Sequence, residues 1–166
     1  MRDAAARAAA LGLDILLPPA PRGDYVRVQV HDGLAHVSGQ LSREGDEVVT
    51  GPATADTDPA VYRRAARACV SRVLGALNHE LGGLDAVQGI VSVRGFVFSD
   101  PTFARHSAVL DQVSGLFAEV FGEAGRHART AVGVASLPDR GLLEIEVVAA
   151  ITPTPTTHDE PTDRSS

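Results

Sequence analysis

Hydrophobic and polar residues alternate along three stretches of the chain. Residues 24–40, 88–98 and 130–151 place apolar side chains at about every second position, which is typical of strands with one buried face. The first stretch contains Asp32-Gly33, a pair that favours a two-residue primed turn, so this stretch predicts a β-hairpin. The last stretch turns near Pro138–Gly141 and predicts a second hairpin, whereas 88–98 is expected to form a central strand.

Two other stretches repeat apolar residues every three to four positions, which is the period of an amphipathic helix. The spacing predicts helices over residues 59–80 and 101–121. Each begins with an aspartate followed by proline, a helix-start signal that stands at Asp58-Pro59 and Asp100-Pro101. The alanine-rich residues 2–12 favour a shorter helix by propensity. The arginines of the first long helix lie off its apolar stripe and are expected to form a solvated face: Arg63, Arg64, Arg67 and Arg72.

The elements follow the order β-β-(β)-α-β-α-β-β, in which a short strand near Glu47–Thr50 is the bracketed one. This order predicts an α+β fold in which two helices lie on one face of a mixed sheet. The other face would have no cover, and exposed apolar strands usually mark an oligomer interface. We expect an N-terminal helix and proline-rich connection over 1–22, a folded domain over 23–151 and a disordered tail over 152–166.

The charge and composition of the chain exclude several classes of function. All 15 basic residues are arginine, and the absence of lysine excludes a lysine Schiff base and a phosphate-binding P-loop. A net charge of −6 and the absence of tryptophan argue against a nucleic-acid partner. No apolar run approaches the ~18 residues that a membrane helix needs, so we expect a cytoplasmic protein with no membrane partner.

Two charged residues interrupt the apolar stretch near the end of the chain. Arg129 stands at the start of its first strand, and Glu144 lies on the strand that follows. The planar guanidinium of an arginine in a cleft can donate two hydrogen bonds to a substrate carboxylate. A nearby glutamate can orient or deprotonate a water. The pattern alone is equally compatible with a surface salt bridge.

Metal sites and covalent nucleophiles find little support in the sequence. The histidines show neither a helical pair at metal-binding spacing nor a cluster with cysteine, so we expect no metal. No Gly-x-Ser-x-Gly motif is present, and the single cysteine, Cys69, lies inside a predicted helix as a small buried hydrophobe. Acid–base or electrostatic chemistry on a small anion is therefore the enzymatic interpretation that the residues favour.

Several of these residues together resemble the Rid family of reactive-intermediate deaminases, also called the YjgF/YER057c/UK114 family. The resemblance covers roughly residues 10–151 and is carried by Tyr25, by Ser38-Gly39-Gln40, by the segment Gly-Arg-His-Ala-Arg-Thr-Ala-Val-Gly-Val-Ala-Ser-Leu-Pro at 125–138 and by Glu144-Ile145-Glu146. It implies a chorismate-mutase-like fold and a homotrimer with clefts between its subunits. It also implies hydrolysis of 2-enamino and 2-imino acids to 2-oxo acids and ammonia, without a cofactor. The long N-terminal segment is similar to a divergent subgroup labelled endoribonuclease L-PSP-like.

The resemblance assigns a role to each matching residue. Arg129 would hold the carboxylate of the substrate, and Glu144 would position or activate the attacking water. Tyr25 would close the cleft, and Ser38 and Gly39 would line it. Taken alone, Ser38-Gly39 is also compatible with a simple bulge or turn at the end of a strand.

This chain departs from the family pattern at two places. Ala131, whose backbone would contribute polar groups to the cleft, stands where better-studied members have cysteine. The second long helix carries Asp111-Gln112-Val113-Ser114, where the divergent subgroup often has Asn-Gly-x-Ser. These departures leave a non-catalytic trimeric module that binds a small carboxylate as the main alternative. A ribonuclease follows only from the family label.

Overall fold

The structure is a computed structural model, and it describes residues 3–15 and 20–152. The tail expected to be disordered lies outside the described residues apart from Thr152, and so does most of the proline-rich connection. Among the residues described, no helix is long and apolar enough to cross a membrane.

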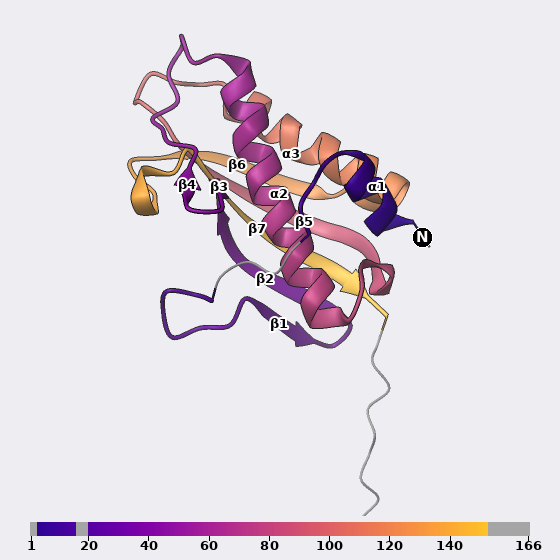
Figure 1. The fold of residues 1–166 in the computed structure, drawn as a ribbon. Coiled ribbons are helices and arrows are strands. Elements are labelled where there is room, and N and C mark those ends of the chain that lie inside the picture. The colour runs from indigo at the N-terminus through magenta and orange to yellow at the C-terminus, as the bar shows by residue number, and fades with distance from the viewer. Residues whose placement is uncertain (1–2, 16–19, 153–166) are drawn as a thin grey trace, which may run out of the picture.

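One five-stranded sheet forms the centre of the molecule (Figure 1). Its strands lie in the order β1, β2, β7, β5, β6. Only β5 and β6 run parallel, and the other neighbours are antiparallel, so the sheet is mixed as expected. The bounds of these strands are β1 Val28–His31, β2 Leu34–Leu41, β5 Val87–Phe98, β6 Ala128–Val134 and β7 Leu143–Ile151. A separate two-stranded ribbon of β3 (Arg43–Glu44) and β4 (Glu47–Val48) follows β2.

The helices lie on one face of the sheet, which confirms the predicted layer architecture (Figure 1). The long helices are α2 (Pro59–Leu81) and α3 (His106–Phe121), and α1 (Ala4–Ala10) packs beside α3. The apolar stripes of α2 and α3 meet the inward side chains of the sheet in one continuous core. Three short 3₁₀ turns complete the chain: η1 (Leu84–Ala86), η2 (Gly122–Gly125) and η3 (Pro138–Arg140).

The helix-start signals were correct for one helix and wrong for the other. Asp58 caps α2, because its Oδ1 accepts a hydrogen bond from the backbone N–H of Ala60 at 2.8 Å. Asp100 was expected to cap the second helix in the same way. Its carboxylate instead accepts from the backbone N–H groups of Thr102 and Phe103, so that it closes a turn, and α3 begins five residues later than predicted.

The first predicted hairpin is confirmed. Asp32 and Gly33 both have left-handed backbone angles, with φ of 47° and 73°, as a primed turn between β1 and β2 requires. Beyond the hairpin, the register of β2 against β7 shifts between Val37 and Gln40. Ser38 and Gly39 therefore lie in a bulge.

The second predicted hairpin, over residues 130–151, is wrong. The two strands of that stretch are β6 and β7, but β5 lies between them and pairs with both. The reason is the helical crossover from β5 through α3 to β6. Such a crossover returns the chain in the same direction, so β6 pairs with β5 in parallel on one side. The following strand then occupies the other side of β5.

The face of the sheet that the helices leave uncovered is chemically mixed. Along β7, Glu144, Glu146 and Val148 point away from the helices, while the residues between them are buried. Arg94 on β5 pairs with Glu146 at 3.6 Å near the middle of this face. On the edge strand β6, Val132 is 40% exposed. The uncovered face is thus suited to an interface that combines apolar contact with charge pairing.

Candidate active site

Arg129 lies on the edge strand β6 and points toward the helices. Its register partner on β5 is Val93, which in turn pairs with Val147, and both valines are buried against the helix layer. Its Nη1 donates to Asp111 Oδ1 at 2.8 Å and to Ser114 Oγ at 3.0 Å. Helix α3 therefore fixes the guanidinium from one side.

Ser114 is held in turn by hydrogen bonds that continue to His127 and Gly125. Its Oγ lies 3.0 Å from His127 Nε2, and His127 Nδ1 lies 2.7 Å from the carbonyl oxygen of Gly125. A carbonyl only accepts, so Nδ1 carries the hydrogen, and in the neutral ring Nε2 accepts from the Ser114 hydroxyl. The same Oγ then accepts from Arg129, and every bond in the chain has a consistent direction.

Sequence reasoning missed these supporting residues. Asp111 and Ser114 were noted only as a departure from the family pattern, and His127 only as a histidine among arginines. The available signal was their spacing: residues three apart on a helix share a face, so Asp111 and Ser114 approach one strand together.

Glu144 occupies a different place. Glu144 on β7 is paired with Phe96 of β5, and Phe96 is paired in turn with Val132 of β6. These side chains point to the uncovered face of the sheet. Gly39 lies against its carboxylate, since a Cβ at position 39 would stand 2.5 Å from Glu144 Oε1. Only glycine leaves room for the carboxylate in this orientation.

The Glu144 carboxylate has no hydrogen bond or ion pair with any residue that the structure describes. Burial raises the pKa of this carboxyl above its ordinary value, and the neighbouring charge of Glu146 raises it further. A half-buried carboxylate that has no partner among the described residues and whose pKa is raised is suited to accept and return a proton.

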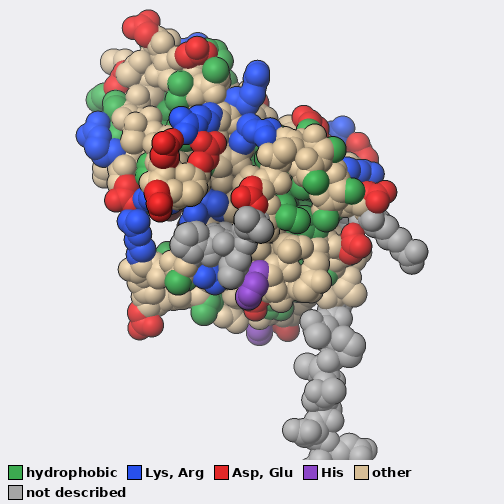
Figure 2. Space-filling model, in the orientation of Figure 1, with side chains coloured by type: hydrophobic (Ala, Val, Ile, Leu, Met, Phe, Trp, Pro, Cys, Tyr) green, Lys and Arg blue, Asp and Glu red, His purple; other side chains and the backbone are tan. Residues whose placement is uncertain are grey.

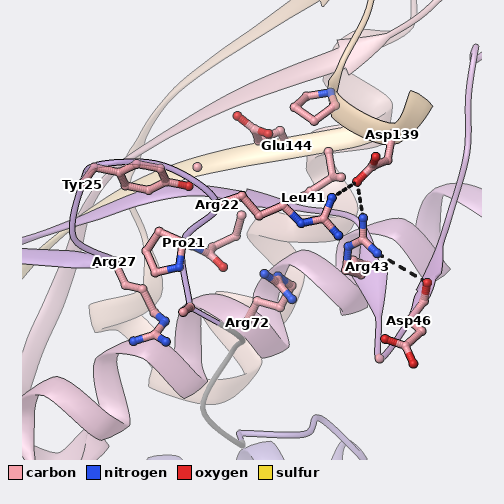
Figure 3. Close-up of a pocket in the computed structure, with 15 residues that line it drawn as sticks. Pro21, Arg22, Tyr25, Arg27, Leu41, Arg43, Asp46, Arg72, Asp139 and Glu144 are labelled. Carbon is pink, nitrogen blue, oxygen red and sulfur yellow. Dashed lines mark hydrogen bonds and ion pairs between the residues drawn. The ribbon is translucent and has the colours of Figure 1, made fainter.

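Tyr25 and Gly39 line the same cavity as Glu144, with a volume of about 290 Å³ (Figure 3). Tyr25 is 55% exposed at its rim. Ser38, which was expected to line the cleft, lines a neighbouring cavity together with Tyr25, and it also anchors the segment that carries Tyr25. Its Oγ donates to the carbonyl of Val26 at 2.7 Å, and its N–H donates to the carbonyl of Arg27 at 2.9 Å.

The structure does not bring Arg129 and Glu144 together within one chain. They lie on opposite faces of the sheet, two strands and three residues apart, which corresponds to roughly 14 Å between their Cα atoms. Ala131, two residues after Arg129, shares the face of Arg129. The predicted residues thus form two half-sites: Arg129 and Ala131 in one, and Tyr25, Gly39 and Glu144 in the other.

Neither half-site contains a metal cluster or an active thiol. No group of three or more His, Cys, Asp or Glu side chains that could hold a metal ion occurs in the described part of the chain. Cys69 is fully buried in α2, and burial raises the pKa of its thiol well above its ordinary value. The thiol is therefore neutral and packed, as expected from the sequence.

Comparison with known proteins agrees with these motifs and this fold. A family model described as "Endoribonuclease L-PSP" matches residues 17–151. The chain belongs to the endoribonuclease L-PSP family, which is the Rid family. A curated L-PSP relative is Protein TCP17 of Trypanosoma cruzi, with 37% identity over 85% of this chain and 89% of that protein.

Two solved structures illustrate how the L-PSP fold is shared. The protein Atu1372 of Agrobacterium tumefaciens, of unknown function, has 36% identity and a TM-score of 0.80, covering 90% of this chain and 94% of that one. YyfA of Yersinia pestis, described as a Rid-family protein of unknown function, has 26% identity and a TM-score of 0.56, covering 82% and 94%. The L-PSP family and fold are thereby shown.

The raised pKa of Glu144 predicts a pH-dependent effect on stability. The folded state binds the proton of this carboxyl more tightly than the unfolded state, so Glu144 lowers the free energy of unfolding as the pH rises above its ordinary pKa near 4.5. We expect Glu144→Gln to be more stable than the unsubstituted protein at pH 7, with the difference vanishing below about pH 4. Denaturant unfolding across pH measures this.

The matched control is Glu119→Gln, which removes an exposed glutamate from α3. It should leave the pH profile of stability unchanged. A Glu144→Gln variant that is less stable than the unsubstituted protein at pH 7 would contradict the assignment.

Proposed function

We propose that this protein hydrolyses 2-imino and 2-enamino acids to 2-oxo acids and ammonia, in sites that a homotrimer forms between its subunits. The observation that carries this proposal is the division of the expected residues into two half-sites. Arg129 is pre-oriented by Asp111 and Ser114, and Glu144 is left without a partner. The half-site of Arg129 would bind the substrate carboxylate, and the half-site of Glu144 would accept the proton. Each therefore supplies the group that the other lacks.

Two half-sites roughly 14 Å apart on opposite faces of the sheet cannot grip one small substrate within a single chain. A neighbouring copy resolves the problem if its uncovered face meets the β6 edge of the first. Contacts between two different patches are repeated at every boundary of a closed ring. The trimer implied by the Rid resemblance is such a ring, with one complete site at each boundary.

The chemistry then follows from the two charges. The Arg129 N–H groups that do not bond to Asp111 and Ser114 would hold the substrate carboxylate. Glu144 of the neighbouring copy would take a proton from a water whose oxygen attacks the imine carbon. Return of that proton to the nitrogen gives a neutral carbinolamine. Glu144 then takes the proton of the new hydroxyl group and passes it to the same nitrogen, so that the C–N bond breaks, ammonia leaves and the 2-oxo acid remains. The raised pKa of Glu144 supports these proton transfers.

A non-catalytic module that binds a small carboxylate is the second candidate. The observation that favours it is the contact of Asp111 with Arg129 at 2.8 Å, because this carboxylate neutralises part of the charge that would hold a substrate. Calorimetry with pyruvate and 2-oxobutanoate separates the two functions. Binding that is lost in Arg129→Gln, with no imine turned over by the unsubstituted protein, supports the module.

The proposed activity predicts different effects for the two central residues. Arg129→Gln should raise KM, lowering kcat/KM about a hundredfold through loss of the charged hydrogen bonds. Glu144→Gln should lower kcat by about 10² to 10⁴, since it removes the proton acceptor. The measurement is ammonia release from freshly generated 2-aminoacrylate and 2-iminobutanoate, with Glu119→Gln as the control. No acceleration by the unsubstituted protein over buffer would refute the proposal.

The proposed trimer predicts a second set of variants. Val132→Arg places a charge on the exposed face of β6, where the neighbouring copy would pack. We expect it to yield folded, inactive monomers, as measured by light scattering and circular dichroism. The control is Ser107→Arg, which adds the same charge on exposed α3. Equal oligomeric states for the two variants would contradict this arrangement.

A further inference from the structure

Arg72 is a half-buried cation without an anion. It lies on α2, on the floor of the cavity that Tyr25 and Glu144 line (Figure 3). Within the described chain, its guanidinium makes no hydrogen bond and no ion pair, and its Nε is buried without any acceptor. Burial of an unpaired charge is costly, so such a group usually has an unrecorded partner.

Other arginines of the region do have acidic partners. On the face seen in Figure 2, arginine and acidic side chains lie side by side. Arg64, two turns before Arg72 on the same helix, contacts Glu44 at 2.7 Å and Glu47 at 3.0 Å. Arg72 was expected from the sequence to share this solvated face, and the structure shows that it turns into the cavity instead.

The charges around Arg72 add to its need for an anion. Arg43 and Arg27 lie near enough to disfavour its charged form, and burial lowers its pKa more than either does. One acid of the cavity wall, Asp139, is already engaged by Arg22 at 2.7 Å and by Arg43. The cavity lining as a whole contains four arginines and three acids.

Gln40 is a second polar side chain of the cavity lining that the described residues leave incompletely hydrogen-bonded. Its side chain is only 5% exposed, and its Nε2 donates to the carbonyl of Ser38 at 2.9 Å. Its Oε1 is buried and has no donor.

We propose that Arg72 binds a second carboxylate of the substrate, so that the preferred substrates are imino acids derived from acidic amino acids. This inference rests on the proposed function, in which the neighbour's Arg129 holds the first carboxylate and Glu144 acts at the imine carbon. Only the side chain of the substrate is then left to enter the cavity. An apolar side chain there would leave Arg72 without a counter-charge, whereas a carboxylate pairs with it.

The test compares 2-iminosuccinate and 2-iminoglutarate with 2-iminobutanoate, each generated in the assay by an amino-acid oxidase. For the unsubstituted protein we expect kcat/KM to be at least about tenfold higher for the dicarboxylic imines. Arg72→Gln should reduce this ratio at least about tenfold. Arg63→Gln, an exposed arginine of the same helix, should leave the ratio unchanged. An unsubstituted protein that shows no preference overturns the inference, whether or not Arg72→Gln folds.

A binding measurement separates this inference from the proposed function. Calorimetry should show that 2-oxoglutarate binds at least about tenfold more tightly than 2-oxobutanoate and that Arg72→Gln abolishes the difference. If no imine is hydrolysed but this difference is found, the proposed function fails and the dicarboxylate site stands. If imines are hydrolysed but neither ratio depends on Arg72, the function stands and the dicarboxylate site is refuted.

Discussion

The position of β5 between β6 and β7 is the constraint on which the account of this protein depends. The crossover through α3 makes β6 parallel to β5, and β7 then pairs with the opposite side of β5. Arg129 and Glu144 are close in the sequence but are kept apart by a full strand and by the thickness of the sheet. A single chain therefore keeps the two residues apart, and the proposed chemistry requires a second copy of the chain.

Local signals in the sequence were sufficient for most of the elements. The Asp32-Gly33 turn, the cap at Asp58 and the alternation along β7 depend on neighbouring residues only, and the structure agrees with each. The order of strands in the sheet, by contrast, depends on contacts between segments that are distant in the sequence. Alternation reports which face of a strand is buried but not which strand lies beside it, and so two consecutive strands were mistaken for a hairpin.

The same distinction applies to the site. The motifs identified Arg129 and Glu144, yet their local pattern did not reveal that Asp111, Ser114 and His127 hold the arginine in place. Arg72 followed the helical spacing of a solvated face, and only the packing of β2 and the segment before it against α2 shows that it is enclosed. Burial by a distant segment is a tertiary property that a helical pattern does not record.

Two unpaired charged side chains in the cavity lower the stability of the fold, and one function would explain both. Among the residues that the structure describes, neither the carboxylate of Glu144 nor the guanidinium of Arg72 has a partner, and both line one cavity. Proteins retain such groups mainly where function requires them, because each lowers the stability of the empty fold. A substrate with charge at both ends would relieve the cation, and the reaction would use the carboxylate.

In the proposed trimer, each site takes Arg129 from one chain and Glu144 from another. An experiment that mixes subunits of two variants tests this arrangement directly. Arg129→Gln and Glu144→Gln chains, each expected to keep about a hundredth or less of the unsubstituted kcat/KM, would be unfolded together in equal amounts and refolded, beside each variant and the unsubstituted protein treated alone. Activity would be assayed at substrate concentrations well below KM. Random assembly places both intact residues at about a quarter of the subunit boundaries, so we expect about a quarter of the unsubstituted activity. A mixture that assembles but stays as inactive as its parents would contradict it.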